Sequence, residues 1–141
     1  MTVSARAVIK GEVPPVPVVF TTEALSLWGG FDPDTGTVTD THHPLCGTRL
    51  AGSIFVLPAG RGSSTSSAIL LEAVRQQTAP AAFAFRRLDP VFAVGSLVAE
   101  KLYGRPVPML VVDDDQTFAS LSGAARASIT AEGCLVVHAH A

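Results

Sequence analysis

Apolar and polar residues alternate along the middle of this chain in blocks that predict a strand, a helix and a second strand. Two compact apolar runs, one ending at Leu57 and one at Phe85, have the length and composition of buried strands. Between them, apolar residues recur every three or four positions, as on one face of an amphipathic helix. We therefore predict a right-handed βαβ unit. Its parts are strands Leu50–Leu57 and Ala81–Phe85 and helix Thr65–Gln77, with Ile69, Leu70, Ala73 and Val74 on the buried face.

The flanking segments add a second helix and strands near both ends of the chain. Downstream, the pattern predicts a helix over Val91–Tyr103, ended by Gly104, and then a buried strand over Pro108–Val112. Further strands are predicted upstream and, as a hairpin, in the tail. They are Ala5–Glu12, Val18–Phe20, Thr37–Asp40, and the pair Ser128–Thr130 and Cys134–His138.

Three prolines in the segment Pro14–Pro17 interrupt the N-terminal strands. Because proline has no N–H to donate to a neighbouring strand, we expect an edge or a bend here rather than a central strand. Strands at both ends and βα units in the centre predict a single α/β domain, residues 1–141, with three layers in the order β/β/α. The turn after Leu57 carries neither the G-x-G-x-x-G fingerprint nor a Walker A sequence, which argues against a nucleotide-binding sheet.

A turn rich in glycine and hydroxyl residues, Pro58–Ser67, links the central strand to the following helix. The first N–H groups of a helix have no partner within it, and the helix dipole favours negative charge there. The turn is therefore predicted to be an anion site. In it, Arg61 pairs with a carboxylate or phosphate, and Ser63 or Ser64 takes part in a reaction. The alternative is that the serines only cap the helix, for which the three hydroxyl residues after Ser64 already suffice.

Composition narrows the possible partners and the compartment. The chain is 48% hydrophobic with a formal net charge of −2, and it contains one Trp and one Tyr. The apolar surplus fits either a well-filled core or a surface buried against another chain. The absence of a basic cluster and of aromatic platforms argues against a nucleic-acid partner. No run approaches the roughly 18 apolar residues of a membrane helix, and no secretory signal begins the sequence, so we expect a cytoplasmic protein.

The cysteines and histidines do not form a metal-binding pattern. Cys46 and Cys134 lie far apart and are expected to be reduced thiols. Two cysteines are also fewer than the four thiolates that usually hold an iron–sulfur cluster. His42 and His43 precede Cys46, but no second ligand cluster accompanies them, so an ordinary loop is favoured.

Three other segments allow both a functional and a structural interpretation. Trp28, next to two glycines, is expected either to form the wall of a ligand pocket or to pack a long loop onto the core. His138 and His140 are expected to be solvated near the terminus. For Asp113–Asp115, a charged turn that ends a strand is favoured over a cation site.

Three motifs follow one another in a recognisable order. They are Leu25–Gly36 (LSLWGGFDPDTG), Asp40–Pro44 (DTHHP) and Gly60–Ser67 (GRGSSTSS), with further matches at Thr78–Ala82 and Ala93–Gly95. Over about residues 6–112 the chain closely resembles the small subunit, or swivel domain, of aconitase X. This resemblance implies a β/β/α swivelling domain that belongs to a hydro-lyase and works only as a heterodimer with a separate large subunit. It also implies that the iron or iron–sulfur centre is held by that large subunit and not by this chain.

The resemblance further implies roles for the residues of the turn. In the wider aconitase superfamily a catalytic serine lies in the swivel domain's Gly-x-Gly-Ser-Ser loop, which makes Ser63 the implied base. Arg61, Gly62, Ser64 and Thr65 are the implied substrate-binding residues. Because Thr65 stands where aconitase itself has an arginine, Arg61 becomes the nearest partner for a carboxylate. In the implied mechanism, the metal binds the substrate's 3-hydroxyl as a Lewis acid while Ser63 removes the proton α to the carboxylate.

The substrate and one other class of function stay open at this point. The family includes cis-3-hydroxy-L-proline dehydratase in bacteria and phosphomevalonate dehydratase in archaea. An excess of Arg over Lys favours a bacterial catabolic enzyme and hence cis-3-hydroxy-L-proline. The alternative class is a non-catalytic regulatory module that binds an anionic metabolite. A phosphocarrier domain would need a histidine in a glycine-rich loop, a setting that His43 lacks.

Overall fold

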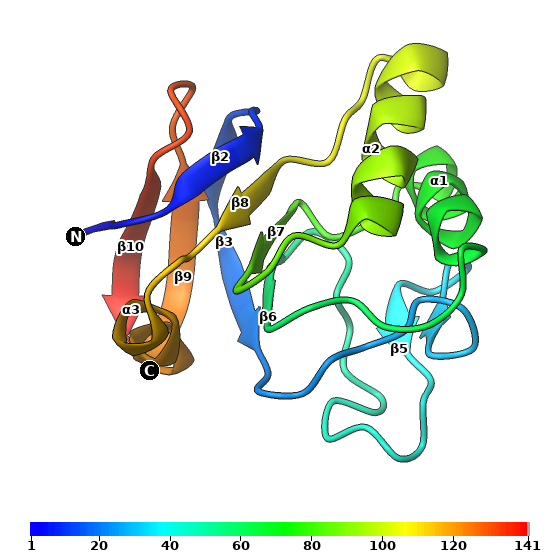
Figure 1. Ribbon diagram of the computed structural model, residues 1–141, viewed down its shortest axis with the longest axis horizontal. Coiled ribbons are helices and arrows are strands. Elements are labelled where there is room, and N and C mark those ends of the chain that lie inside the picture. Colours follow the sequence, from blue (N-terminus) through cyan, green and yellow to red (C-terminus); the bar gives the residue numbers. More distant parts are fainter. Residues whose placement is uncertain (141) are drawn as a thin grey trace.

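The computed structural model describes residues 1–140, in which the strands form one curled sheet and a small separate ribbon (Figure 1). The order in the sheet is β1-β10-β9-β3-β6-β7-β8-β2, and β4 pairs with β5 in the ribbon. The strands are β1 (Thr2–Val3), β2 (Arg6–Ile9), β3 (Val13–Phe20), β4 (Phe31–Asp32), β5 (Thr37–Val38), β6 (Ile54–Leu57), β7 (Ala82–Phe85), β8 (Met109–Val111), β9 (Ala124–Ile129) and β10 (Leu135–His140). The helices are α1 (Ser66–Gln76), α2 (Pro90–Tyr103), α3 (Asp115–Ser120) and the short 3-10 turn η1 (Leu121–Gly123).

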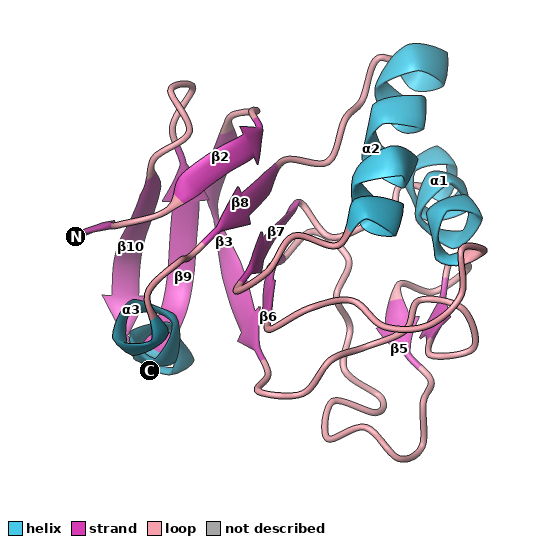
Figure 2. Cartoon of the chain, in the orientation of Figure 1, coloured by secondary structure: helices cyan, strands magenta, loops and turns pink. Residues whose placement is uncertain are grey.

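Two hydrophobic cores separate three layers in the order β/β/α (Figure 2). One core lies between the helices α1 and α2 and the strands β6 to β8, and it contains Phe83 and Phe85. The other lies between those strands and the β9–β10 hairpin, and it contains Ala84 and Leu135. Successive side chains of β7 therefore enter different cores, as the alternation of a strand requires. The predicted three-layer α/β fold is confirmed.

The parallel strands β3, β6, β7 and β8 form the centre of the sheet, and the antiparallel strands lie outside them. α1 connects β6 to β7, and α2 connects β7 to β8, as the hydrophobic pattern predicts. Both helices begin and end within one residue of the expected positions. The strand expected from Leu50 begins instead at Ile54. The cause is a tight turn before it, in which Gly52 has φ +73° and the Ser53 N–H donates to Leu50 O at 3.1 Å.

The N-terminal prolines lie in β3, which begins at Val13 and not at the predicted Val18. The strand covers eight residues between β9 and β6, and its register with β9 shifts between Val13 and Val16. Its first half pairs with β9, as in Val13↔Ile129, whereas its last three residues, from Val18, pair with β6. Within residues 1–140 the first half therefore has a strand neighbour on one side only. Pro14 and Pro15 lie where the register with β9 shifts, and the segment has one strand neighbour, so the predicted edge or bend is confirmed.

The hydrophobic pattern missed the short elements β4 and α3. β4 is a two-residue strand, too short to show a period, whereas its partner β5 lies within the strand predicted over Thr37–Asp40. α3 begins inside the acidic turn, where the Asp114 carboxylate accepts a hydrogen bond from the Thr117 N–H at 2.8 Å. Among residues 1–140, no helix combines the length and apolar character needed to cross a membrane.

The two long helices lie side by side on the sheet (Figure 1). Gly95 of α2 allows this close approach, because a Cβ there would lie 2.9 Å from Ser67 O of α1. On the outer face of α1, Arg75 and then Gln76 donate hydrogen bonds to Glu72 and lower the pKa of that carboxyl to about 2. The packing of α2 places its first turn beside the glycine-rich turn that precedes α1.

Candidate active-site loop

The glycine-rich loop leaves the C-terminal end of β6 and leads into α1. Its start is anchored to a neighbouring segment, since the Arg61 N–H donates to Leu25 O at 3.2 Å. Gly60 packs so closely on the start of α2 that a Cβ there would lie 2.7 Å from Asp89 Cγ. Gly62 has φ +95°, a conformation that only glycine adopts without strain. Both glycines thus determine the path of the loop that carries Ser63.

Ser63 lies half-buried, three residues before α1 begins at Ser66. Its Oγ accepts a hydrogen bond from the Thr65 N–H at 3.0 Å, and its carbonyl accepts one from the Ser66 N–H at 3.0 Å. Thr65 occupies the N-cap position, but its side chain makes no capping hydrogen bond. Ser63 is therefore the hydroxyl that meets the start of the helix. An N–H aimed at Oγ favours the negatively charged form of that oxygen.

The loop also presents several backbone N–H groups in a row. Within residues 1–140, the N–H groups of Gly62, Ser63 and Ser64 donate to no protein group. The Ser64 side chain is exposed beside them. Such a run of free donors at the start of a helix is suited to a carboxylate or phosphate oxygen. The loop thus offers free donors for the predicted anion site, and Ser63 Oγ also accepts a backbone N–H at the helix start, as the capping alternative expects.

Arg61 extends from the loop towards the Asp40–Pro44 segment, where its Nη2 lies 3.6 Å from Asp40 Oδ2. These two residues line a pocket of about 340 Å³ together with Glu23, Ala24, His42 and His43. Asp40 is mostly buried, whereas the Arg61 side chain is 61% exposed. The guanidinium thus stands at the surface of the pocket with most of its donors open to solvent.

The third motif, around Leu25–Trp28, borders the same loop. Leu25 and Leu27 are buried in the core, and the Trp28 N–H donates to Ser66 Oγ at 3.3 Å. The Trp28 side chain is 57% exposed, so the buried leucines and not the Trp pack this loop onto the core. The structure therefore brings together all three segments that carry the resemblance.

Histidines and cysteines near the loop have structural or solvent-exposed positions. The His43 ring is buried, its Nδ1 accepts a hydrogen bond from the Leu45 N–H at 3.1 Å, and its Nε2 lies 3.3 Å from Glu23 O. Cys46 and Cys134 are free and exposed. In the part of the chain that the structure describes, no three His, Cys, Asp or Glu side chains are grouped to hold a metal ion. These residues therefore do not fit an iron or iron–sulfur centre.

The acidic turn after β8 is explained by structure. Asp113 pairs with Arg6 at 3.2 Å, and this hydrogen bond lowers the pKa of the Asp113 carboxyl. Asp114 caps α3, and Asp115 pairs with Arg86 at 2.5 Å. Each of the three aspartates thus has a partner within the fold, as the favoured interpretation expects.

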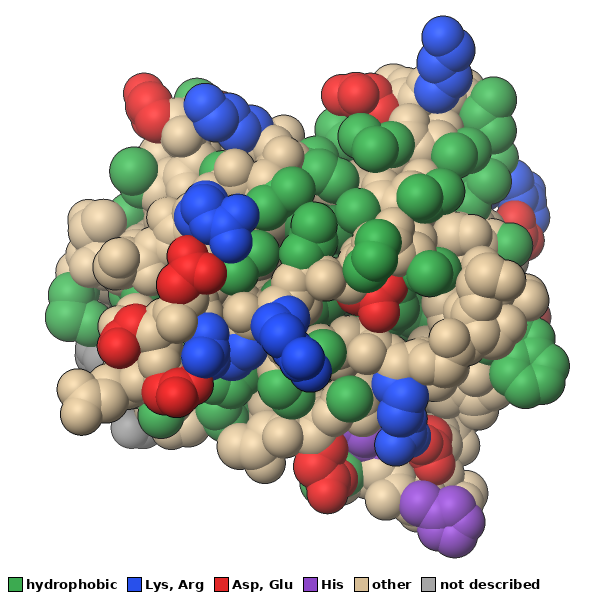
Figure 3. Space-filling view, in the orientation of Figure 1, with side chains coloured by type: hydrophobic (Ala, Val, Ile, Leu, Met, Phe, Trp, Pro, Cys, Tyr) green, Lys and Arg blue, Asp and Glu red, His purple; other side chains and the backbone are tan. Residues whose placement is uncertain are grey.

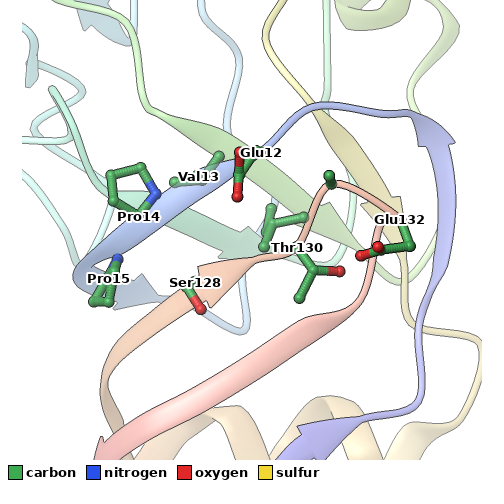
Figure 4. A pocket seen from close by; sticks show the side chains of 9 residues that line it. Glu12, Val13, Pro14, Pro15, Ser128, Thr130 and Glu132 are labelled. Carbon is green, nitrogen blue, oxygen red and sulfur yellow. The ribbon is translucent and has the colours of Figure 1, made fainter.

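A second pocket, of about 480 Å³, lies between β3 and the β9–β10 turn (Figure 4). Glu12 and Glu132 contribute carboxylates to it, and Thr130 lies between them in the view. Ser128, at the same pocket, lies 2.6 Å from His138 Nε2 through its Oγ, so His138 has a partner on the neighbouring strand. This pocket shares no residue with the one beside Arg61.

The three-layer fold and its glycine-rich loop define a swivel domain of the aconitase type. The family model of the aconitase X swivel domain matches residues 2–137, and the chain belongs to this family.

Individual relatives carry two different names. A cis-3-hydroxy-L-proline dehydratase of Pseudomonas aeruginosa is 45% identical over 92 residues, which are 65% of this chain and 16% of that protein. A phosphomevalonate dehydratase small subunit of Methanopyrus kandleri is 42% identical over 95 residues, 67% of this chain and 70% of that subunit. The chain thus spans about a sixth of the length of one relative and most of the other.

A solved structure supports the fold. The aconitase X of Thermococcus kodakaraensis, in its holo-form, superposes with a TM-score of 0.81 and 24% identity, covering 99% of both chains. At 24% identity, this structural similarity is evidence for the fold alone.

Asp40 and Glu23 are pocket residues to which the sequence reasoning gave no role. Asp40 is the first residue of the Asp40–Pro44 motif. However, the sequence around a single carboxylate in a loop does not indicate which side chain it will pair with. The ion pair with Arg61 joins segments that only the folded chain brings together.

Proposed function

We propose that this chain is the swivel subunit of a dehydratase and that Ser63 is the base that removes a proton from the substrate. The observation that carries the proposal is the hydrogen bond from the Thr65 N–H to Ser63 Oγ at the start of α1. A serine hydroxyl is a poor base in water. It becomes effective where donors stabilise the alkoxide and where the closed site excludes water.

The other residues of the loop would bind the substrate. The guanidinium of Arg61 offers paired N–H donors that match a carboxylate. The N–H groups of Gly62 and Ser64, with the hydroxyls of Ser64 and Thr65, complete the binding surface. Holding the carboxylate beside Ser63 presents the proton on the adjacent carbon to Oγ. As this C–H bond breaks, its proton passes to the Ser63 alkoxide, a double bond forms to the next carbon, and the hydroxyl there leaves with the bonding pair as hydroxide. The proton and the hydroxide together are the elements of water.

The group that assists the departing hydroxyl lies outside this chain in our proposal. The residues described do not fit a metal centre, so we place the iron or iron–sulfur centre of the enzyme on the large subunit. The swivel subunit supplies the base and the carboxylate site.

Exposed apolar residues support a partner chain. Hydrophobic side chains gather over α2 in the space-filling view (Figure 3). Val94, Leu97 and Leu102 are each more than half exposed, as is Trp28 beside the loop. An apolar helix face beside a half-open site is typical of a surface that another chain covers. We propose a heterodimer with an aconitase X large subunit, in the cytoplasm, where free cysteines such as Cys46 stay reduced.

For the substrate we propose cis-3-hydroxy-L-proline, with phosphomevalonate as the alternative. The dehydratase of Pseudomonas aeruginosa, a bacterium, has the higher identity of the two relatives described above. Arg61 is also the only cation among the residues that line the pocket, all of which the structure describes. One guanidinium satisfies one carboxylate, and no second Lys or Arg lines this pocket to meet a phosphate group as well.

The test compares Ser63→Ala with Ser64→Ala in the complex with the co-expressed large subunit. Loss of the base should reduce kcat for dehydration by about 10²- to 10⁴-fold while the subunits still co-elute. Ser64→Ala, which removes only a binding hydroxyl, should raise KM and leave measurable kcat. Near-normal turnover by Ser63→Ala would refute the assignment of the base. Assaying both substrates separately decides between them, and inactivity of the wild-type complex on both would refute the proposed function.

A further inference from the structure

We infer that Asp40 is a positioning residue that holds the guanidinium of Arg61 in place for the substrate's carboxylate. This inference rests on the proposed function for the substrate-binding role of Arg61. The two side chains form an ion pair in the structure: Arg61 Nη2 and Asp40 Oδ2 lie 3.6 Å apart, and both residues line the pocket.

The backbone leaves Arg61 in need of such a partner. Arg61 stands between two glycines, and its main chain is anchored by one hydrogen bond, from its N–H to Leu25 O. Its side chain is 61% exposed, and within residues 1–140 Asp40 is the acidic group with which it forms an ion pair. Without that pair, a long exposed side chain would sample many rotamers and would lose entropy on binding the substrate.

Asp40, in contrast, is rigidly held. Its Oδ1 accepts a hydrogen bond from the His42 N–H at 2.9 Å, and its carbonyl accepts one from the His43 N–H at 3.1 Å. The preceding residue is tied down as well, because the Thr39 N–H donates to Gly30 O at 2.9 Å. One carboxylate oxygen is therefore used to fix the turn, and the other faces Arg61.

The ion pair does not block the role of Arg61. A guanidinium has five N–H donors in a planar fork, and Asp40 lies near one terminal nitrogen. The remaining donors can still meet a carboxylate. The arrangement thus orders Arg61 before the substrate arrives, which is how preorganisation improves binding.

The first test needs no activity and uses NMR of the full chain. In the ¹⁵N-labelled protein, the heteronuclear NOE of the Arg61 Nε–Hε group reports the order of the side chain, and Arg61→Lys identifies its signal. Asp40→Asn should lower this NOE to the level of unpaired surface arginines, and Asp40→Glu should restore part of it. Glu23→Gln is the matched control, because it removes a charge from the same pocket but leaves the ion pair. An unchanged NOE in Asp40→Asn would overturn the inference.

The second test uses steady-state kinetics of the assembled enzyme. Asp40→Asn should raise KM about fivefold, the equivalent of a partly exposed ion pair, and change kcat by less than about twofold. In an Arg61→Ala background the same substitution should have no further effect on KM. Additive effects, or a loss confined to kcat, would overturn the inference. If Arg61→Ala alone left KM unchanged, the substrate role of Arg61 in the proposed function would fail instead.

Discussion

Gly60 and Gly62 shape the loop around Ser63 for two different physical reasons. Gly62 has a positive φ, so the requirement lies in its own backbone. Gly60 has no such φ, but it lies against Asp89 and Phe92 at the start of α2. A glycine-rich sequence does not distinguish these causes. Gly62 has a close neighbour as well, since a Cβ there would lie 2.7 Å from Ser26 Oγ, so both positions also depend on other parts of the chain.

Replacing Gly60 with Ala should destabilise the fold by about 1–3 kcal/mol, because the added methyl would overlap the first turn of α2. Its Cβ would lie 2.8 Å from Phe92 Cε1. Gly123→Ala is the control, since a Cβ at Gly123 would meet no atom within 4 Å, and its effect should stay within about 0.5 kcal/mol. Urea unfolding of both variants measures the difference. Equal stabilities would show that the loop moves away from α2 without cost.

At the level of elements, α1 and α2 begin in different ways. α2 starts with Asp89, whose Oδ1 accepts hydrogen bonds from the N–H groups of Val91 at 2.8 Å and Phe92 at 3.0 Å. α1 starts with Thr65, whose side chain caps nothing. The hydroxyl-rich sequence before α1 is suited to capping, yet the structure uses Ser63, outside the helix, to meet the Thr65 N–H. The two helices therefore differ in whether the side chain of the N-cap residue itself accepts a hydrogen bond.

Asp89→Ala should therefore lower the free energy of unfolding by about 1 kcal/mol, the usual value of an N-cap carboxylate. Thr65→Ala should change it by less than about 0.5 kcal/mol, because no capping hydrogen bond is lost. Thermal and urea unfolding at neutral pH give both values. A larger loss for Thr65→Ala than for Asp89→Ala would contradict this account of the two helix starts.

In the molecule as a whole, the strands β6 to β8 contribute side chains to both hydrophobic cores, one on each face. Phe83 and Phe85 point to the helices, and their rings stack with centroids 5.5 Å apart, whereas Ala82 and Ala84 point to the β9–β10 layer. Loss of packing in the core on one face of these strands should therefore also destabilise the core on the other face. We therefore predict that residues 1–141 unfold as one cooperative unit, as expected of a single domain.

Phe83→Ala should lower the stability by about 3–5 kcal/mol without splitting the transition, because the ring is fully buried between the sheet and α2. Far-UV circular dichroism and the fluorescence of Trp28 should give the same midpoint. Leu102→Ala, at a side chain that is 60% exposed, is the control and should stay within about 0.5 kcal/mol. Two separate midpoints would mean that the layers fold independently.

By itself, the sequence determined the βαβ centre, the second helix and the loop that the proposed chemistry needs. These features repeat with local periods or stand out as short motifs, so a window of a dozen residues contains them. The same reasoning placed the prolines of β3 at an edge or a bend but missed that their strand continues beside β6, because a sequence does not say on which side of a strand its neighbours lie. The tertiary structure alone decided that Asp40 meets Arg61 and that Thr65 donates to Ser63. The first contact depends on how distant segments pack, and the second on how the backbone turns. Neither produces a repeating pattern of residues from which it could be predicted.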